Sequence, residues 1–349
     1  LYRSQTSAHQ PVDRGFDEWF GFYGGWIRYK YEQSKETHIR HIKAEPHMQI
    51  LYDGKEKSDE PWEHLTDLLT DKAMGFVAGN KDKPFFLFLS YNAPHGWLYH
   101  ETHPEYSATD EWVEKVRAKY NLPDETWEQR NLIDYIAVTE HMDARIGDLL
   151  ALLKKQNLDQ DTLVVFMSDN GAITPEFYYT LAASGSNGGL RAGKAVPYEG
   201  GVRVPMVISC PSAIAANETV SGFTMGVDIL PTLLDFAGIP VPENNGDHPL
   251  RGISLMPYLK QQQKPLPQRE ALFVNNGMSG ICVMKDPWKL VTLKSRVGAN
   301  KDLTTNEVPT DGWLLFNLDD DIGERKDLSR QYPEKTEELL DFWKDYNRG

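Results

Sequence analysis

Asp169 and Asn170 have the clearest chemistry in this sequence, because they follow directly on the apolar run Thr162–Ser168. A carboxylate beside an amide oxygen offers two hard donors of the kind that bind Ca²⁺ or Mg²⁺. A continuously apolar, β-branched run is typical of a parallel strand buried on both faces, and ligands of open α/β sheets bind beyond the carboxyl ends of such strands. Asp-Asn-Gly is equally typical of a plain turn, so the residues alone leave both interpretations open.

His95 stands in a comparable position. The apolar run Pro84–Ser90 predicts a second buried strand, and His95 follows it in a short loop that contains Pro94. Because the carboxyl ends of parallel strands meet at one edge of a sheet, we expect His95 on the edge that also carries Asp169. The alternative is a histidine that is only solvated or hydrogen-bonded, which is common in proline-containing loops.

A glycine-rich stretch, Gly188–Pro205, carries Arg191, Lys194 and Arg203. Glycines let a backbone approach a ligand closely, and the three cations are candidates to hold an anion. The stretch is not a phosphate loop of the GxxxxGK[ST] type, since neither Ser nor Thr follows Lys194. A surface loop with ordinary solvated charges is the alternative interpretation.

The hydrophobic pattern predicts the elements that must position these side chains. Apolar residues at helical spacing predict helices over 64–78, 131–155 and 224–238, and a further apolar run predicts a strand over 204–209. We assign the helix over 131–155 to core packing, with no chemistry. The expected fold class is α/β, with a largely parallel central sheet flanked by helices.

The pattern changes near residue 270, where short strands precede a terminal helix near 334–346. Strands followed by one helix predict a small antiparallel α+β unit. We therefore expect a main α/β domain over 1–265 and a C-terminal α+β subdomain over 266–349.

Composition narrows the classes of partner. The 349 residues have a formal net charge of −14, which argues against a nucleic-acid groove or an anionic membrane surface. No apolar stretch approaches the roughly 20 residues that span a bilayer. Cys210 and Cys282 are far apart and in no CxxC, so neither a zinc site nor a disulfide framework is indicated.

Six stretches together resemble the type I sulfatases, which are formylglycine-dependent members of the alkaline-phosphatase-like superfamily. They are Arg14–Gly21, Lys83–His95, Thr162–Gly171, Leu190–Pro205, Asp228–Thr232 with Leu250–Ser254, and Leu315–Glu324. They lie in the family's order and span nearly the whole chain, so the resemblance implies the sulfatase fold and a sulfuric ester hydrolase.

The resemblance also implies roles for particular residues. Asp169 and Asn170 match two of the family's metal ligands, with Ca²⁺ the expected ion and Mg²⁺ the second choice. His95 and Lys194 match residues that bind the sulfate group and stabilise charge on the ester oxygens, and Arg191 is a further candidate for substrate binding. A sulfated carbohydrate is the expected substrate class, and the family's usual location is periplasmic or secreted.

One part of the family pattern is not found in this sequence. The family places an Asp-Asp metal pair, a Cys-x-Pro-Ser-Arg segment whose Cys becomes formylglycine, and a Gly-Lys-Trp-His segment ahead of the stretch that matches Arg14–Gly21. Cys210 precedes Pro-Ser directly and lacks the Arg, so we interpret it as a structural thiol. The nucleophile is therefore expected outside this chain, in a preceding segment or a separate N-terminal polypeptide.

Three functions follow from these observations. The first is a sulfatase that hydrolyses a sulfate ester. The second is a phosphoester or phosphonate hydrolase of the same superfamily, since the metal site does not distinguish the two esters. The third is a pseudo-sulfatase that binds sulfated glycans without cleaving them, or an inactive fragment. The sequence gives no indication of the oligomeric state.

Overall fold

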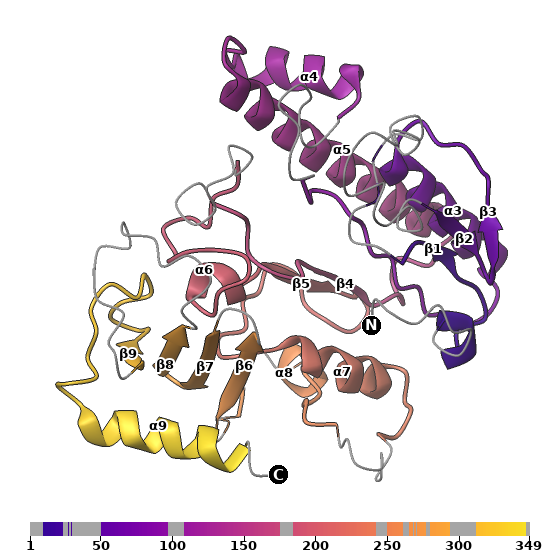
Figure 1. The fold of residues 1–349 in the computed structure, drawn as a ribbon. Coiled ribbons are helices and arrows are strands. Elements are labelled where there is room, and N and C mark those ends of the chain that lie inside the picture. Colours follow the sequence, from indigo (N-terminus) through magenta and orange to yellow (C-terminus); the bar gives the residue numbers. More distant parts are fainter. Residues whose placement is uncertain are drawn as a thin grey trace. The chain divides into compact units, whose positions relative to one another are not determined.

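The computed structural model describes residues 10–23, 27, 29, 50–96, 108–174, 184–241, 250–260, 265–267, 269, 271–276, 280–293 and 312–346 (Figure 1). The chain divides into two compact units. The first consists of Leu1–Asp159 with Thr180–Ser184, and the second of Gln160–Tyr179 with Gly185–Gly349. Among the described residues, no helix has the length and apolar character needed to cross a membrane.

The first unit is built on helices. They are α3 (Leu65–Gly79), α4 (Asp110–Tyr120) and α5 (Trp127–Lys155). Ahead of them the chain forms the short 3₁₀ helix η2 (Pro11–Arg14) and a small antiparallel sheet. The strands of this sheet are β1 (Phe20–Gly21), β2 (Leu51–Asp53) and β3 (Glu56–Ser58). The predicted helices over 64–78 and 131–155 are confirmed. α5 begins earlier than its apolar pattern, because Thr126 and Gln129 form a capping box at its N-terminus.

Two apolar clusters hold the first unit together. In one, Val116 of α4 packs with Ile133, Ala137 and Val138 of α5. In the other, Leu65 and Leu69 of α3 pack with Ile27, Leu51 and Trp62. The core-packing role predicted for the helix over 131–155 is thereby confirmed for its apolar face.

The run Pro84–Ser90 differs from the prediction, since it forms no strand. Its side chains alternate between half-buried and exposed, and Phe86 and Phe88 are 56% and 72% exposed. On the covered side, Leu89 packs against the cluster around Leu65. The prediction of a strand buried on both faces is wrong here because the described residues cover only one side of the run.

In the second unit, β4 (Val164–Met167) and β5 (Met206–Ser209) form the two predicted strands, but they pair with each other antiparallel. The predicted burial on both faces is also wrong, because Phe166 and Val207 are 41% and 60% exposed. Backbone hydrogen bonds extend this antiparallel pairing past the ends of the two strands. Beyond the strands, Ser168 N donates to Pro205 O and Gly171 N donates to Gly201 O, so the glycine-rich stretch runs back along β4.

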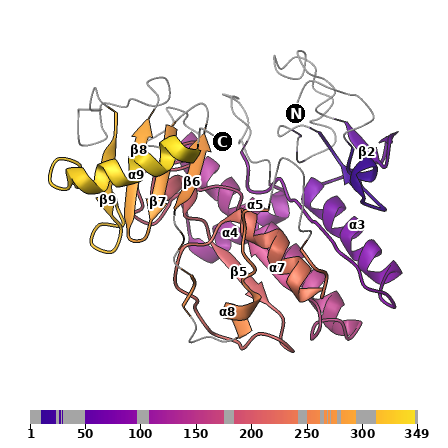
Figure 2. The ribbon, with the colours of Figure 1, turned by 90° about the horizontal axis from the view of Figure 1, so that it is seen from below.

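The chain then forms η4 (Gly226–Asp228), α7 (Ile229–Phe236) and α8 (Met256–Lys260), with α7 inside the predicted helix over 224–238. The C-terminal part is the predicted antiparallel α+β unit. Its sheet has the order β6 (Leu272–Asn276), β7 (Gly280–Lys285), β8 (Trp288–Leu293), β9 (Leu314–Asn317), and α9 (Pro333–Tyr346) crosses it (Figure 2). The α/β class and the C-terminal α+β unit are both confirmed.

The C-terminal sheet is covered on both faces, as the alternation of side chains along its strands requires. One face, with Val283, Leu290 and Leu315, packs on Leu339 of α9. The other face, with Cys282, Val291 and Phe316, packs on Val196 and Tyr198 of the glycine-rich stretch. The sheet therefore supports the backbone that carries Lys194.

Candidate active site

The Asp169–Asn170 turn is held in place by its backbone. Ser168 Oγ donates to Asn170 O at 2.8 Å, and Gly171 N donates to Gly201 O at 3.0 Å. A Cβ on Gly171 would lie 1.7 Å from Gly200 O, so this close approach requires glycine. The carboxylate of Asp169 is exposed, and no hydrogen bond to either the Asp169 or the Asn170 side chain is found among the described residues. Both oxygen donors therefore remain available to a hard cation.

A backbone hydrogen bond holds Lys194 to the residue that follows this turn. Its backbone N donates to Ala172 O at 3.0 Å. Burial lowers the pKa of the Lys194 ammonium, and the negative charge of Asp169 acts in the opposite direction. The structure thus brings the half-buried Lys194 ammonium within electrostatic reach of the Asp169 carboxylate.

Asn187, which sequence reasoning missed, ties the two segments together. Its Oδ1 accepts from Ala172 N at 2.9 Å, and its Nδ2 donates to Ala172 O at 3.2 Å and to Ala192 O at 2.8 Å. One amide side chain therefore fixes the distance between the turn after β4 and the segment before Lys194. An asparagine among glycines reads as a turn former, so its type alone gives no sign of this role.

Arg191 has structural partners in this unit. Its Nη1 donates to Glu324 O at 2.6 Å, and its guanidinium lies 4.2 Å from the centroid of the Tyr198 ring and 5.9 Å from that of Phe316. These contacts place the guanidinium over the C-terminal sheet. A role in substrate binding stays a prediction for this residue.

A buried ion network, also missed from the sequence, anchors the glycine-rich stretch. Lys289 of β8 is fully buried, and its Nζ lies 2.7 Å from Glu199 Oε1 and 2.9 Å from Glu324 Oε1. Glu199 N donates to Glu324 Oε2 at 2.6 Å, and Arg203 Nε lies 2.5 Å from Glu199 Oε2. Burial acts to lower the pKa of Lys289, but the surrounding charges, chiefly that of Glu324, raise it, so the ammonium stays charged.

His95 belongs to the first unit, where it closes a tight turn. Its N donates to Asn92 O at 2.7 Å, and the Ala93–Pro94 peptide bond within the turn is cis. Tyr29 Oη donates to His95 O at 3.0 Å, and Tyr91 Oη bonds Thr70 Oγ1 of α3 at 2.7 Å. The turn is thus held by two tyrosines. The placement of His95 on one edge with Asp169 stays a prediction, because the two residues belong to different units.

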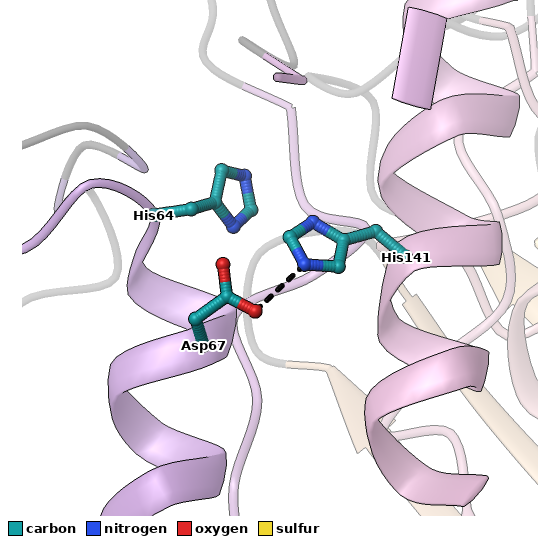
Figure 3. Close-up of side chains that lie close together, drawn as sticks. All are labelled: His64, Asp67 and His141. Atoms are coloured by element: carbon teal, nitrogen blue, oxygen red, sulfur yellow. Dashed lines mark hydrogen bonds and ion pairs between the residues drawn. The ribbon is translucent and has the colours of Figure 1, made fainter. Parts of the chain in front are cut away.

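A further group of ligand-type side chains, which the sequence analysis did not single out, lies between α3 and α5. It consists of His64, Asp67 and His141, whose candidate ligand atoms all lie within 4.8 Å of one another (Figure 3). We refer to it as the α3–α5 cluster. It lies in the first unit, whereas Asp169 and Asn170 lie in the second.

Comparison with known proteins places the chain in a family. The Sulfatase family profile matches residues 2–239. Human steryl-sulfatase is 34% identical over 200 residues, which cover 57% of this chain and 30% of that protein. N-acetylgalactosamine-6-sulfatase of Mus musculus is 28% identical over 267 residues, which cover 72% of this chain and 44% of that protein. The chain thus spans less than half the length of these two relatives.

The fold comparison agrees with the family profile. The crystal structure of Ps i-CgsB superimposes with a TM-score of 0.76 at 28% identity, covering 98% of this chain and 68% of that one. A second structure of that protein, in complex with k-i-k-neocarrahexaose, gives a TM-score of 0.75 at the same identity and coverage. The sulfatase-like fold class predicted from the sequence is confirmed. With the profile matching well over half of its residues, the chain belongs to the sulfatase family.

Proposed function

We propose that the protein is a sulfuric ester hydrolase whose substrate is a sulfated carbohydrate. The observation that carries the proposal is the fixed juxtaposition of Lys194 with the Asp169–Asn170 turn, in a chain whose residues 2–239 match the Sulfatase family. A sulfate group carries a negative charge that must be neutralised as the S–O bond breaks. The two oxygen donors and the ammonium are the groups that this neutralisation requires.

Asp169 and Asn170 fit a hard divalent cation, with Ca²⁺ as the expected ion. Both donors are oxygens, they are adjacent in sequence, and Gly171 holds their turn against the glycine-rich stretch. When bound, such an ion polarises the sulfate oxygens. Because Ca²⁺ takes six to eight oxygen ligands, these two residues supply only part of its coordination.

Lys194 and His95 have separate roles in the proposal. The Lys194 ammonium, half-buried beside Asp169, binds a sulfate oxygen and stabilises the charge that develops in the transition state. His95 donates a proton to the oxygen of the leaving alcohol. Neither cysteine suits the nucleophile: Cys210 and Cys282 are both buried, and burial raises the pKa of Cys282 to about 11. The nucleophile is therefore not assigned to either residue.

Two similar proteins and one group of aromatic side chains support a carbohydrate as the alcohol part of the sulfate ester. The mouse relative is named for an amino-sugar sulfate, and Ps i-CgsB has a structure with k-i-k-neocarrahexaose. In the first unit, Trp19, Tyr23 and Tyr52 form an aromatic group whose ring centroids lie 4.6 to 6.0 Å apart, with Tyr23 exposed. Tyr52 is buried, so Tyr23 is the ring of this group whose face is open for stacking on the apolar face of a sugar.

The test is turnover of three matched substrates by the complete protein with Ca²⁺: a sugar sulfate, a steroid sulfate and the corresponding sugar phosphate. We expect the sugar sulfate to have the highest kcat/KM. Preference for the steroid sulfate would overturn the substrate class, and preference for the phosphate would support the phosphoester hydrolase. Tight binding of the sugar sulfate without turnover would support the pseudo-sulfatase instead.

A further inference from the structure

We propose that the α3–α5 cluster, His64, Asp67 and His141, is a binding site for a divalent transition-metal ion, with Zn²⁺ as the best fit. His64 is the N-cap of α3, Asp67 lies in the first turn of that helix, and His141 lies in the middle of α5. Figure 3 shows the three side chains converging between the two helices, with His141 Nε2 at 2.8 Å from Asp67 Oδ1.

The donor set selects the kind of ion. Two imidazoles and one carboxylate suit Zn²⁺ and its neighbours in the first transition row, whereas Ca²⁺ and Mg²⁺ prefer oxygen alone. The candidate ligand atoms lie within 4.8 Å of one another. With metal–ligand bonds of about 2.1 Å, ligands of a tetrahedral ion lie about 3.4 Å apart, so binding needs side-chain shifts of only about an ångström.

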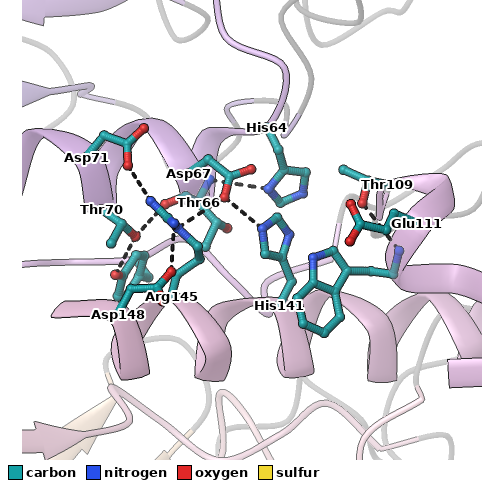
Figure 4. Close-up of polar contacts among 12 residues, drawn as sticks. His64, Thr66, Asp67, Thr70, Asp71, Thr109, Glu111, His141, Arg145 and Asp148 are labelled. Carbon is teal, nitrogen blue, oxygen red and sulfur yellow. Dashed lines mark hydrogen bonds and ion pairs between the residues drawn. The ribbon is translucent and has the colours of Figure 1, made fainter. Parts of the chain in front are cut away.

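The local charge favours a dication. Arg145 Nε lies 3.2 Å from Asp67 Oδ1, its Nη1 lies 2.7 Å from Asp148 Oδ2, and its Nη2 contacts Asp71 (Figure 4). Three carboxylates thus face one guanidinium, which leaves two formal negative charges when His141 is neutral.

The surroundings orient the rings. Trp112 stacks on His141 with centroids 5.2 Å apart, and Tyr29 stacks on His64 at 5.1 Å. His64 and His141 are buried, and His141 Nδ1 has no hydrogen-bond partner among the described residues. The Asp67 side chain is 38% exposed, which leaves a path for an ion and for a water as a further ligand.

The experiment is a Zn²⁺ titration of the complete, chelator-treated protein by competition with a chromophoric chelator. Millimolar Ca²⁺ is present throughout to occupy oxygen-donor sites. We expect one high-affinity Zn²⁺ per chain, an affinity at least tenfold weaker in Asp67→Asn and His141→Gln, and an increase in Tm on loading. Asp143→Asn is the matched control, because Asp143 is an exposed carboxylate on α5 only two residues from His141.

Two further measurements keep the outcome decisive. The Asp169→Asn variant must still bind one Zn²⁺ per chain. If this variant no longer binds Zn²⁺, the ion belongs to the Asp169–Asn170 turn and not to the α3–α5 cluster. X-ray absorption of the Zn²⁺-loaded wild-type protein must show scattering from two imidazoles. This measurement does not depend on the variants, so it decides the question even if Asp67→Asn or His141→Gln fails to fold. An oxygen-only shell, no high-affinity Zn²⁺, or an equal loss of affinity in Asp143→Asn would each overturn the proposal.

Discussion

At the scale of single residues, the function proposed for Lys194 should be separable from the fold. Its backbone N is bonded to Ala172 O, but no hydrogen bond to its Nζ is found among the described residues. Lys194→Ala should therefore reduce kcat/KM by roughly tenfold or more, through loss of charge stabilisation in the transition state, with Tm unchanged within a few degrees. Exposed Lys81→Ala is the control in the same assay. Unchanged kinetics in Lys194→Ala would remove this residue from the active site.

The pH profile tests the charge state of the same residue. Burial lowers the pKa of Lys194, so its ammonium is lost at a lower pH than that of a free lysine. If the ammonium binds sulfate, kcat/KM should fall on the alkaline side with an apparent pKa below the ordinary lysine value. In Lys194→Arg this limb should disappear, because a guanidinium stays charged. An alkaline limb that persists unchanged in Lys194→Arg would assign it to another group.

At the scale of elements, the buried network around Lys289 holds the glycine-rich stretch to the C-terminal sheet. Lys289→Met leaves the carboxylates of Glu199 and Glu324 buried with the cation between them gone. We expect a loss of about 3–5 kcal/mol in the free energy of unfolding, measured by chemical denaturation. Lys285→Met on neighbouring β7 removes a partly exposed pair with Glu338 and should cost less than about 1 kcal/mol. Equal losses in the two variants would contradict the role of the network.

Gly171 tests how closely the turn must approach the glycine-rich stretch. In Gly171→Ala the new Cβ would lie 1.7 Å from Gly200 O, so one of the two backbones must move. Activity should fall by roughly tenfold or more, because the Asp169–Asn170 turn is displaced from Lys194. Gly75→Ala in α3 meets nothing within 4 Å and should stabilise the protein by up to about 1 kcal/mol. Full activity in Gly171→Ala would show that the close approach is not required.

The parts of this structure that the sequence predicted are those that local patterns determine. α3 and α5 were predictable because their apolar residues recur at helical spacing. The pairing of β4 and the packing around Pro84–Ser90 were not predictable, because the partners of a strand lie far away in the sequence. Likewise Arg191 and Glu324 are 133 positions apart, and Glu199 and Lys289 are 90 apart, so no local spacing indicates that they meet.

The α3–α5 cluster could not be predicted from local sequence patterns either. His141 lies in a helix whose apolar residues indicated packing, and that assignment is correct for Ile133, Ala137 and Val138. Its chemistry depends on Asp67, 74 positions earlier, and becomes visible only when α3 packs on α5. The grouping of Lys194 with Asp169 in one site came from the family resemblance, because the spacing of the two residues alone does not indicate it.

At the scale of the whole molecule, the two compact units should respond separately to perturbation. Each has its own buried apolar clusters, around Leu65 and Ile133 in the first unit and around Cys282 and Leu290 in the second. Compact units with separate cores tend to open as separate cooperative units in hydrogen exchange. Zn²⁺ should therefore slow amide exchange in α3 and α5 and leave β7 and β8 unchanged.

Lys289→Met provides the reciprocal perturbation, because its charge partners all lie in the second unit. It should accelerate exchange in β7, β8 and residues 190–203, while α3 and α5 keep their wild-type rates. Hydrogen-exchange mass spectrometry of the complete protein resolves these segments in one experiment, with Lys285→Met as the control. If Zn²⁺ and Lys289→Met alter the same segments, the two units unfold as one, and the metal would then stabilise the Lys194 stretch together with α3 and α5.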